Sequence, residues 1–436
     1  MGTLGFGAMI VELINTGSEL LLGRVLNTHQ QWLCRRLADL GYLVTRQVAV
    51  PDTGPAIEQV VREALARADL VITTGGLGPT TADLTRERIA HLLGKPLHED
   101  AAVLARLTRY FKSRKRPMPE RTRVQAQVPE DATVVPNPNG TAPGLALEVR
   151  PNPFRPDGQA TWLIMLPGPP RELRPMFRDS VVPLLRSVLP PPGSFVCRTL
   201  RTTGIGESMV QEKIAGPLQR WVAAGLDLGY LARPGEVDVR LAVQGTDAER
   251  QVREAEAVVR ELLGPYIYAV EDEDLETVIV RLLTERKATL ALAESCTGGC
   301  IANRITNVPG ASAVLLAGLV TYSNAAKEKF LGVHAETLAQ HGAVSKPVAR
   351  EMAEGARRET QADYALAVTG IAGPSGATPG KPVGTVFIAL AGPSGTVIEH
   401  NLNPYDRETF KQVTTQQALE LLRRAVLRSF AESTRG

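Results

Sequence analysis

The chain has 436 residues, of which 44% are hydrophobic, and a formal net charge of +3. This length predicts two or three domains, no apolar run is long enough to cross a membrane, and the near-neutral charge argues against a nucleic-acid partner. Four scattered cysteines without a Cys-x-x-Cys pair argue against a disulfide framework or a zinc site, and residues 1–8 lack the pattern of a signal peptide, which predicts a cytoplasmic location.

Residues 9–94 alternate strand-like and helix-like patterns. Apolar runs at 10–14 and 70–74 predict strands, and apolar residues at helical spacing between them predict connecting helices. Such alternation is typical of a parallel sheet with right-handed crossovers. We therefore expect an α/β domain over residues 9–190, with further sheet segments at 146–149 and 162–166.

Two more regions follow. A proline-rich linker at 190–193 precedes a small α+β module over residues 194–271, in which 237–243 alternates apolar and polar residues as a half-exposed strand does. The α/β pattern returns over residues 272–436 and ends in a long helix from Arg407. The predicted fold class is two three-layer α/β domains joined by a small α+β module.

Glycine-bearing turns follow predicted strands in the first domain, at residues 15–19, 74–80, 137–144 and 166–170. Turns at the carboxyl ends of parallel strands form the usual ligand crevice of an α/β sheet. The glycines would let the backbone approach a phosphate, and Asp83 at the next helix start could reach a hydrated Mg²⁺. We expect a phosphorylated ligand here.

The last domain carries a comparable strand end. An apolar run at 289–294 stops at Ser295-Cys296-Thr297-Gly298-Gly299, and a helical pattern begins at Ile301. Such a turn would leave N–H groups free at a positive helix end, which suits a phosphate or a developing oxyanion. Ser295 stands where a nucleophile or an anion anchor would stand.

The motifs of the first domain resemble the CinA family (competence/damage-inducible protein A). They are Gly17–Gly23, Gly75–Thr80, Asn137–Gly144 and Leu166–Pro170. The resemblance implies a molybdopterin-binding-like domain, which in several members is associated with metal-dependent hydrolysis of ADP-ribose. It also implies that the nucleotide or metal contacts are Glu19, Gly76, Gly78, Thr80, Asp83 and Thr141, with Asp83 as the metal ligand and Mg²⁺ or Co²⁺ as the candidate metal.

The chain departs from the family at one position of this site. Ala82 precedes Asp83 where the family usually has two adjacent acidic residues, so a metal would lose one carboxylate. We expect the domain to bind ADP-ribose or a related nucleotide and to show little or no pyrophosphatase activity.

The family's middle domain is KH-like, and KH domains hold nucleic acid through a Gly-x-x-Gly loop. Residues 195–270 contain no such loop. This again argues against nucleic acid and favours a spacer or dimerisation role, in keeping with the homodimer that the family implies.

The motifs from residue 293 to 384 resemble nicotinamide-nucleotide amidase. That enzyme domain hydrolyses the carboxamide of nicotinamide mononucleotide (NMN) to nicotinate mononucleotide and ammonia, a reaction of NAD recycling. The resemblance implies that the reaction needs no cofactor. Serine needs a base, and no histidine lies in these motifs. The resemblance assigns the catalytic roles to Ser295, Tyr322 and Lys327. The expected substrate contacts are Thr297, Gly298, Gly299, Thr369, Gly370, Gly373 and Arg407, the last as a phosphate partner.

Other interpretations of these residues stay open at this point. Ser295 could do no more than cap the helix, or Ser295 and Thr297 could hold the NMN phosphate while water attacks. The whole chain could also be a non-catalytic sensor of pyridine nucleotides, and ammonia release from NMN separates a sensor from an enzyme.

Overall fold

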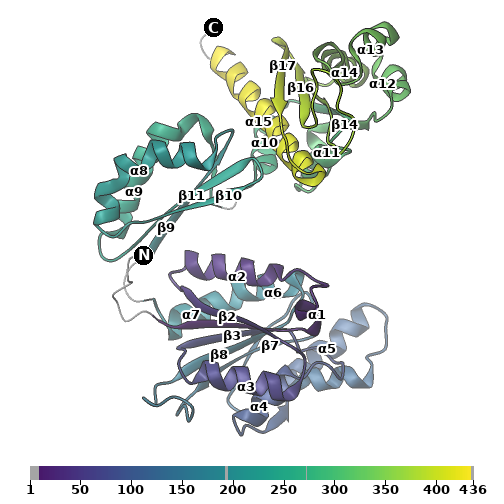
Figure 1. The fold of residues 1–436 in the computed structure, drawn as a ribbon. Helices are drawn as coiled ribbons and strands as arrows, with labels where there is room; N and C mark the ends of the chain where they lie inside the picture. The colour runs from purple at the N-terminus through teal and green to yellow at the C-terminus, as the bar shows by residue number, and fades with distance from the viewer. Residues whose placement is uncertain (1–8, 192–194, 272, 434–436) are drawn as a thin grey trace. The chain divides into compact units, whose positions relative to one another are not determined.

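The computed structural model describes residues 9–191, 195–271 and 273–433. Part of the predicted linker at 190–193, and the predicted boundary residues 194 and 272, therefore lie outside the described residues. The chain forms two compact units, the first containing the chain up to Val196 and the second almost all of the rest. The predicted fold class is confirmed, because both units contain α/β sheets and the second also contains a small α+β module (Figure 1).

The first unit is built on a six-stranded sheet in the order β2-β1-β3-β8-β7-β6. Four neighbouring strands, β2, β1, β3 and β8, run parallel, as the alternating pattern predicts. At one edge of the sheet, β7 and β6 are antiparallel to their neighbours, because a loop and no helix joins β7 to β8. The strands are β1 Val11–Thr16, β2 Val44–Val50, β3 Leu70–Thr74, β6 Thr133–Val135, β7 Gly144–Val149 and β8 Thr161–Leu166.

Helices cover both faces of this sheet (Figure 1). Leu13 and Ile72 pack on one face with α2 Thr28–Asp39, α6 Pro170–Met176 and α7 Val182–Val188. Ile14 and Val71 pack on the other face with α3 Gly54–Leu65, α4 Thr85–Leu92 and α5 Ala101–Ser113. Successive strand residues thus enter opposite cores, which makes a three-layer domain. Smaller elements complete it, namely α1 Ser18–Leu21 and the antiparallel pair β4 Leu97–Glu99 and β5 Gln127–Pro129.

The middle module has a four-stranded sheet in the order β10-β11-β9-β12. Two amphipathic helices pack together through buried residues such as Val210, Ile214, Val252 and Val259. The elements are β9 Phe195–Thr203, α8 Glu207–Ala223, β10 Asp227–Arg233, β11 Glu236–Gln244, α9 Ala248–Leu263 and β12 Ile267–Val270.

The last domain has a five-stranded sheet in the order β14-β13-β15-β16-β17, of which β14, β13 and β15 are parallel. Its strands are β13 Leu290–Glu294, β14 Leu315–Val320, β15 Tyr364–Gly370, β16 Thr385–Gly392 and β17 Gly395–Leu402. Leu290 and Leu292 pack with helices α10 Leu275–Glu285, α11 Cys300–Thr306 and α15 Arg407–Ser433. Ala291 and Ala293 pack on the opposite face with α12 Asn324–Leu331, α13 Ala335–His341 and α14 Lys346–Thr360. Across the described residues, no helix is both long and apolar enough to cross a bilayer.

Candidate active site

Ser295 lies at the carboxyl end of β13, which is flanked by β14 and β15 in the last sheet. Its backbone N–H donates to the carbonyl of Val368 on β15 at 3.0 Å, which holds the residue in line with the strand. Its side chain accepts a hydrogen bond from Lys327 Nζ at 3.1 Å. Two of the three predicted catalytic residues are therefore in contact.

Lys327 is almost completely buried, with 1% of its surface exposed. It lies in the first turn of α12, whose N-terminal residue Ser323 accepts a hydrogen bond from Ala326 N–H. Besides Ser295, Nζ donates to the carbonyl oxygens of Thr321 at 2.8 Å and Tyr322 at 3.3 Å. Among the described residues no ion pair joins it to a carboxylate, and burial lowers the pKa of this amine.

These three contacts match the needs of a neutral amine. A neutral lysine has two N–H donors and one lone pair. Carbonyl oxygens only accept, so Thr321 and Tyr322 can occupy both N–H groups. In this neutral form the 3.1 Å contact reverses, because the Nζ lone pair can then accept the Ser295 hydroxyl proton. This geometry is one that a serine nucleophile and a lysine base could use.

The helix end beside Ser295 differs from the sequence-based expectation. Glu294, itself 1% exposed, accepts hydrogen bonds from the N–H groups of Gly299, Ile301 and Ala302 at 2.8–3.1 Å. Gly298 N–H donates to the Ser295 carbonyl. The prediction of free N–H groups at these positions is wrong, because a buried carboxylate already binds the positive end of α11. Ser295 does not cap this helix: Gly299 is its N-terminal boundary and makes no side-chain cap.

Tyr322 has a different environment from the one expected of a proton relay. Its side chain is 59% exposed, and its hydroxyl accepts a hydrogen bond from Arg407 Nη2 at 2.7 Å. Arg407 also donates to the carbonyl of Gly373 at 2.9 Å. The structure thus brings the predicted residues Tyr322, Gly373 and Arg407 together, with the Tyr322 hydroxyl bonded to a cation and only its carbonyl bonded to Lys327.

The other predicted substrate contacts divide into two kinds. The side chains of Thr297 and Thr369 are buried, and the Thr369 hydroxyl donates to Ala343 O, so these side chains belong to the interior. The glycines allow close approaches: a side chain on Gly370 would meet the Thr385 carbonyl at 2.8 Å. Gly298 and Gly299 both have positive φ, at 62° and 94°, which favours glycine at this turn.

Lys411 is a site residue that the sequence reasoning missed. A side chain on Gly298 would lie 3.8 Å from Lys411 Nζ, so this ammonium faces the turn after Ser295. Lys411 follows Arg407 by one helical turn of α15. This i, i+4 spacing places both side chains on one face of the helix and could have identified Lys411 from the sequence. Two cations from α15 therefore lie beside the candidate site.

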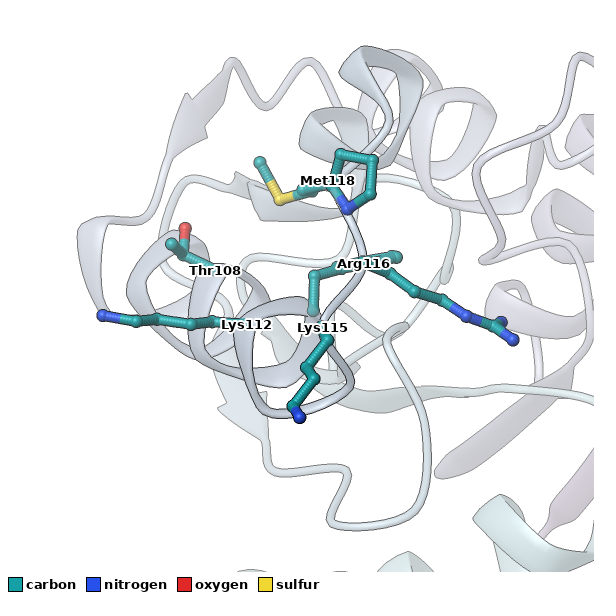
Figure 2. Close-up of a pocket in the computed structure, with 7 residues that line it drawn as sticks. Thr108, Lys112, Lys115, Arg116 and Met118 are labelled. Atoms are coloured by element: carbon teal, nitrogen blue, oxygen red, sulfur yellow. The ribbon is translucent and has the colours of Figure 1, made fainter.

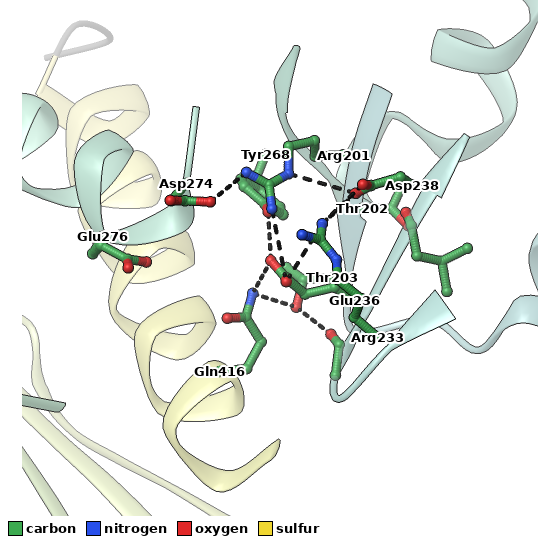
Figure 3. A network of polar contacts seen from close by, with 12 residues as sticks. Arg201, Thr202, Thr203, Arg233, Glu236, Asp238, Tyr268, Asp274, Glu276 and Gln416 are labelled. Carbon is green, nitrogen blue, oxygen red and sulfur yellow. Dashed lines mark hydrogen bonds and ion pairs between the residues drawn. The ribbon is translucent and has the colours of Figure 1, made fainter. Parts of the chain in front are cut away.

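A polar residue of α15 joins the last domain to the middle module within the second unit (Figure 3). Gln416 is buried; its Oε1 accepts from Arg304 of α11 at 2.8 Å. Its Nε2 donates to Thr203 and Glu236 of the middle module at 3.2 and 3.1 Å. The helix that follows the Ser295 turn is thereby linked through Gln416 to the middle sheet.

The first domain has a cleft of about 420 Å³ at the carboxyl ends of its strands. The structure brings five of the six predicted nucleotide contacts to its lining, namely Glu19, Gly76, Gly78, Asp83 and Thr141. Thr80 is adjacent, since its N–H and hydroxyl donate to the Asp83 carboxylate at 2.9 and 2.6 Å. Ala82 also lines the cleft, so an acidic side chain at this position would face the same space.

Two of the carboxylates that line the cleft already accept hydrogen bonds. Asp83 Oδ2 already accepts two hydrogen bonds from Thr80. Glu172, another lining carboxylate, accepts from Asn137 at 2.7 Å. In the described part of the chain, no three His, Cys, Asp or Glu side chains converge as metal ligands do. A metal at Asp83 would therefore have no three-residue ligand set among the described residues, and it stays a prediction.

Family models match three consecutive parts of the chain: a probable molybdopterin binding domain at residues 12–187, a damage-inducible protein CinA KH domain at 197–269 and a CinA C-terminal domain at 272–426. A CinA-like protein of Akkermansia muciniphila is 46% identical over 410 residues, covering 94% of this chain and 95% of that protein. A CinA-like protein of Gemmatimonas aurantiaca is 41% identical over 433 residues, covering 98% of this chain and 99% of that protein.

Among solved structures, the competence/damage inducible protein CihA from Agrobacterium tumefaciens is 42% identical, covers 35% of this chain and 93% of its own, and has a TM-score of 0.33. The relatives match essentially from end to end, and the resemblance read from the motifs is confirmed. The chain belongs to the CinA family of competence/damage-inducible proteins.

Proposed function

We propose that the last domain hydrolyses the carboxamide of NMN to nicotinate mononucleotide and ammonia, with Ser295 as nucleophile and Lys327 as base. The observation that carries the proposal is the 3.1 Å contact between Lys327 Nζ and Ser295 Oγ, made by an amine that is buried and whose pKa is lowered by burial. Amide hydrolysis needs an activated nucleophile and a proton for the leaving ammonia, and this pair can supply both.

In the first half-reaction Ser295 Oγ attacks the carboxamide carbon while its proton passes to Lys327 Nζ. The Oγ–C bond forms and the C–N bond then breaks. Lys327 gives the proton to the departing nitrogen, which leaves as ammonia. In the second half-reaction Lys327 takes a proton from water, the hydroxide attacks the ester carbon, and Ser295 leaves with that proton, releasing nicotinate mononucleotide.

The phosphate of NMN would lie against the start of α15. Arg407 is held over the site by Gly373 and Tyr322, and a guanidinium pairs well with a phosphate. Lys411 adds a second cation near Gly298. In this assignment Tyr322 positions Arg407, and the proton transfers belong to Lys327.

The decisive experiment measures ammonia release from NMN by the purified full-length protein and its Ser295→Ala variant. We expect kcat to fall by about 10³-fold or more with KM little changed, since a nucleophile acts only in the chemical step. Ser312→Ala, an exposed serine of the same domain, should keep the wild-type rate. A rise in KM at unchanged kcat would make Ser295 a phosphate anchor, and absence of any turnover by the wild type would favour a nucleotide sensor.

For the first domain we propose binding of ADP-ribose or a related nucleotide in the 420 Å³ cleft. The support is the convergence of Gly76, Gly78 and Thr141 on one cleft at the sheet edge, where backbone can approach a phosphate. Calorimetric titration with ADP-ribose tests binding, and ADP-ribose turnover with Mg²⁺ or Co²⁺ at ordinary enzyme rates would contradict the expected loss of pyrophosphatase activity. The homodimer and the cytoplasmic location stay predictions.

A further inference from the structure

The first domain carries a concentrated positive charge that its cleft does not use. Residues 106–123 contain eight arginines and lysines and one acidic residue, a formal charge of +7 in a chain whose total is +3. Arg106 donates to backbone carbonyls of the cleft loop, Arg123 pairs with Glu99, and Arg114 lies over the Tyr110 ring. The other five basic residues are exposed and form no ion pair within the described residues; they are Arg109, Lys112, Lys115, Arg116 and Arg121.

Three of these cations line a groove of about 400 Å³ after the end of α5 (Figure 2). The half-buried side chains of Phe111 and Met118 line it as well. Figure 2 shows the side chains of Lys112, Lys115 and Arg116 pointing in different directions from the end of the helix. Cations that diverge in this way cannot converge on one phosphate, but they can each meet a different phosphate of an extended anion.

The backbone fixes this divergence. The N–H groups of Arg114 and Arg116 both donate to the Phe111 carbonyl, and Lys115 between them has a φ of 52°. Glycine is the usual residue at this left-handed position after a helix, and another residue costs roughly 1 kcal/mol. The chain therefore has a lysine where glycine would give the more stable turn, as it also has at Lys287 after α10.

We propose that this face, defined by Arg109, Phe111, Lys112, Lys115, Arg116 and Arg121, binds single-stranded nucleic acid. The cations match a series of phosphates, and the apolar lining of the groove offers a surface on which an unstacked base can lie. A duplex offers phosphates but no free base face. The proposal does not depend on the amidase activity. It differs from the expectation that a near-neutral chain has no nucleic-acid partner, because a local cluster of charge can bind an anion even when the net charge of the whole chain is small.

The test is a fluorescence anisotropy titration of the full-length protein with a labelled oligothymidylate of about 20 nucleotides, a length that spans a typical single-strand site. Five phosphate contacts predict that log K falls with log salt at a slope of about −3.5. The variant Lys112→Gln/Lys115→Gly/Arg116→Gln should bind about tenfold or more weakly and lower the slope by about 2. Its Lys115→Gly component relieves the left-handed strain, so the variant keeps a stable fold.

The control variant Lys213→Gln/Arg253→Gln/Lys346→Gln removes the same number of exposed positive charges elsewhere in the chain. We expect it to bind as the wild type does. Equal weakening of both variants would reduce the effect to net charge and overturn the proposal. No binding at about 50 mM salt, or equally tight binding of a duplex, of phosphatidylserine vesicles or of polyglutamate, would overturn it too.

Discussion

Replacing Lys327 with methionine removes the buried amine while keeping a side chain of similar volume, and so tests the role of the amine. The substitution removes the only hydrogen-bond partner of the Ser295 hydroxyl among the described residues. A positioned general base contributes roughly 10²–10⁴-fold, so kcat for ammonia release should fall by that factor. The carbonyls of Thr321 and Tyr322 lose their donor. Each carbonyl that water does not reach then destabilises the fold by about 1–3 kcal/mol. Relief of the burial cost of the amine opposes this, and we expect unfolding free energy to fall by less than about 3 kcal/mol.

The same variant makes a prediction about pH. Burial lowers the pKa of Lys327 below its ordinary value of 10.5. Because the neutral amine is the base, kcat/KM of the wild type should rise with pH and level off at this lowered pKa. The unfolded chain holds the proton up to about 10.5, so the free energy of unfolding should also rise with pH between the two pKa values. Both dependences should be absent in Lys327→Met.

The assays are ammonia release against pH and urea unfolding against pH, with Lys329→Met as control. Lys329 lies on the same helix α12 and is exposed, so its loss should change neither quantity. A Lys327→Met protein that is folded and retains wild-type turnover would refute the base assignment. A wild-type profile that rises only near 10.5 would refute the claim that burial tunes this amine.

Three further changes test other parts of the molecule. Gln416→Leu removes hydrogen bonds to the buried Thr203 and to the partly buried Arg304 and Glu236, and should lower the unfolding free energy by about 1–3 kcal/mol in urea melts, whereas exposed Gln412→Leu should not. Arg407→Ala should raise the KM for NMN about tenfold or more at nearly constant kcat in steady-state assays, and an unchanged KM would exclude the phosphate contact. Ala82→Asp should raise Mg²⁺-dependent ADP-ribose hydrolysis, measured as AMP formation, if the missing carboxylate limits it; an unchanged rate would contradict that reason.

Patterns of apolar residues were sufficient to predict the sheets. Strands such as β1 and β13 are buried on both faces, and the apolar run of β13 is visible in the sequence. The antiparallel edge of the first sheet was not visible, because its direction depends on the loop that joins β7 to β8. Motif spacing likewise brought Ser295 and Lys327 together, since both follow neighbouring parallel strands.

The sequence pattern could not predict the directions in which individual side chains point. Nothing in the run before Ser295 indicates that Glu294 turns back onto the N–H groups of α11. Tyr322 follows β14 as predicted, yet its ring is exposed and its hydroxyl meets Arg407, 85 residues later. Gln416 bonds to partners up to 213 residues away, and such contacts exist only once the modules are packed.

The carboxylate of Glu294 bears directly on what Ser295 does. A phosphate anchored at the start of α11 would compete with this buried carboxylate for N–H groups that are already bonded and would lie close to a like charge. Arg407 and Lys411 give the phosphate a better position at the start of α15. With the phosphate held there, Ser295 is left for the carboxamide end of the substrate, and its one side-chain partner is the buried amine of Lys327. The same carboxylate that overturns the expected anion pocket therefore favours Ser295 as the nucleophile over Ser295 as the anchor.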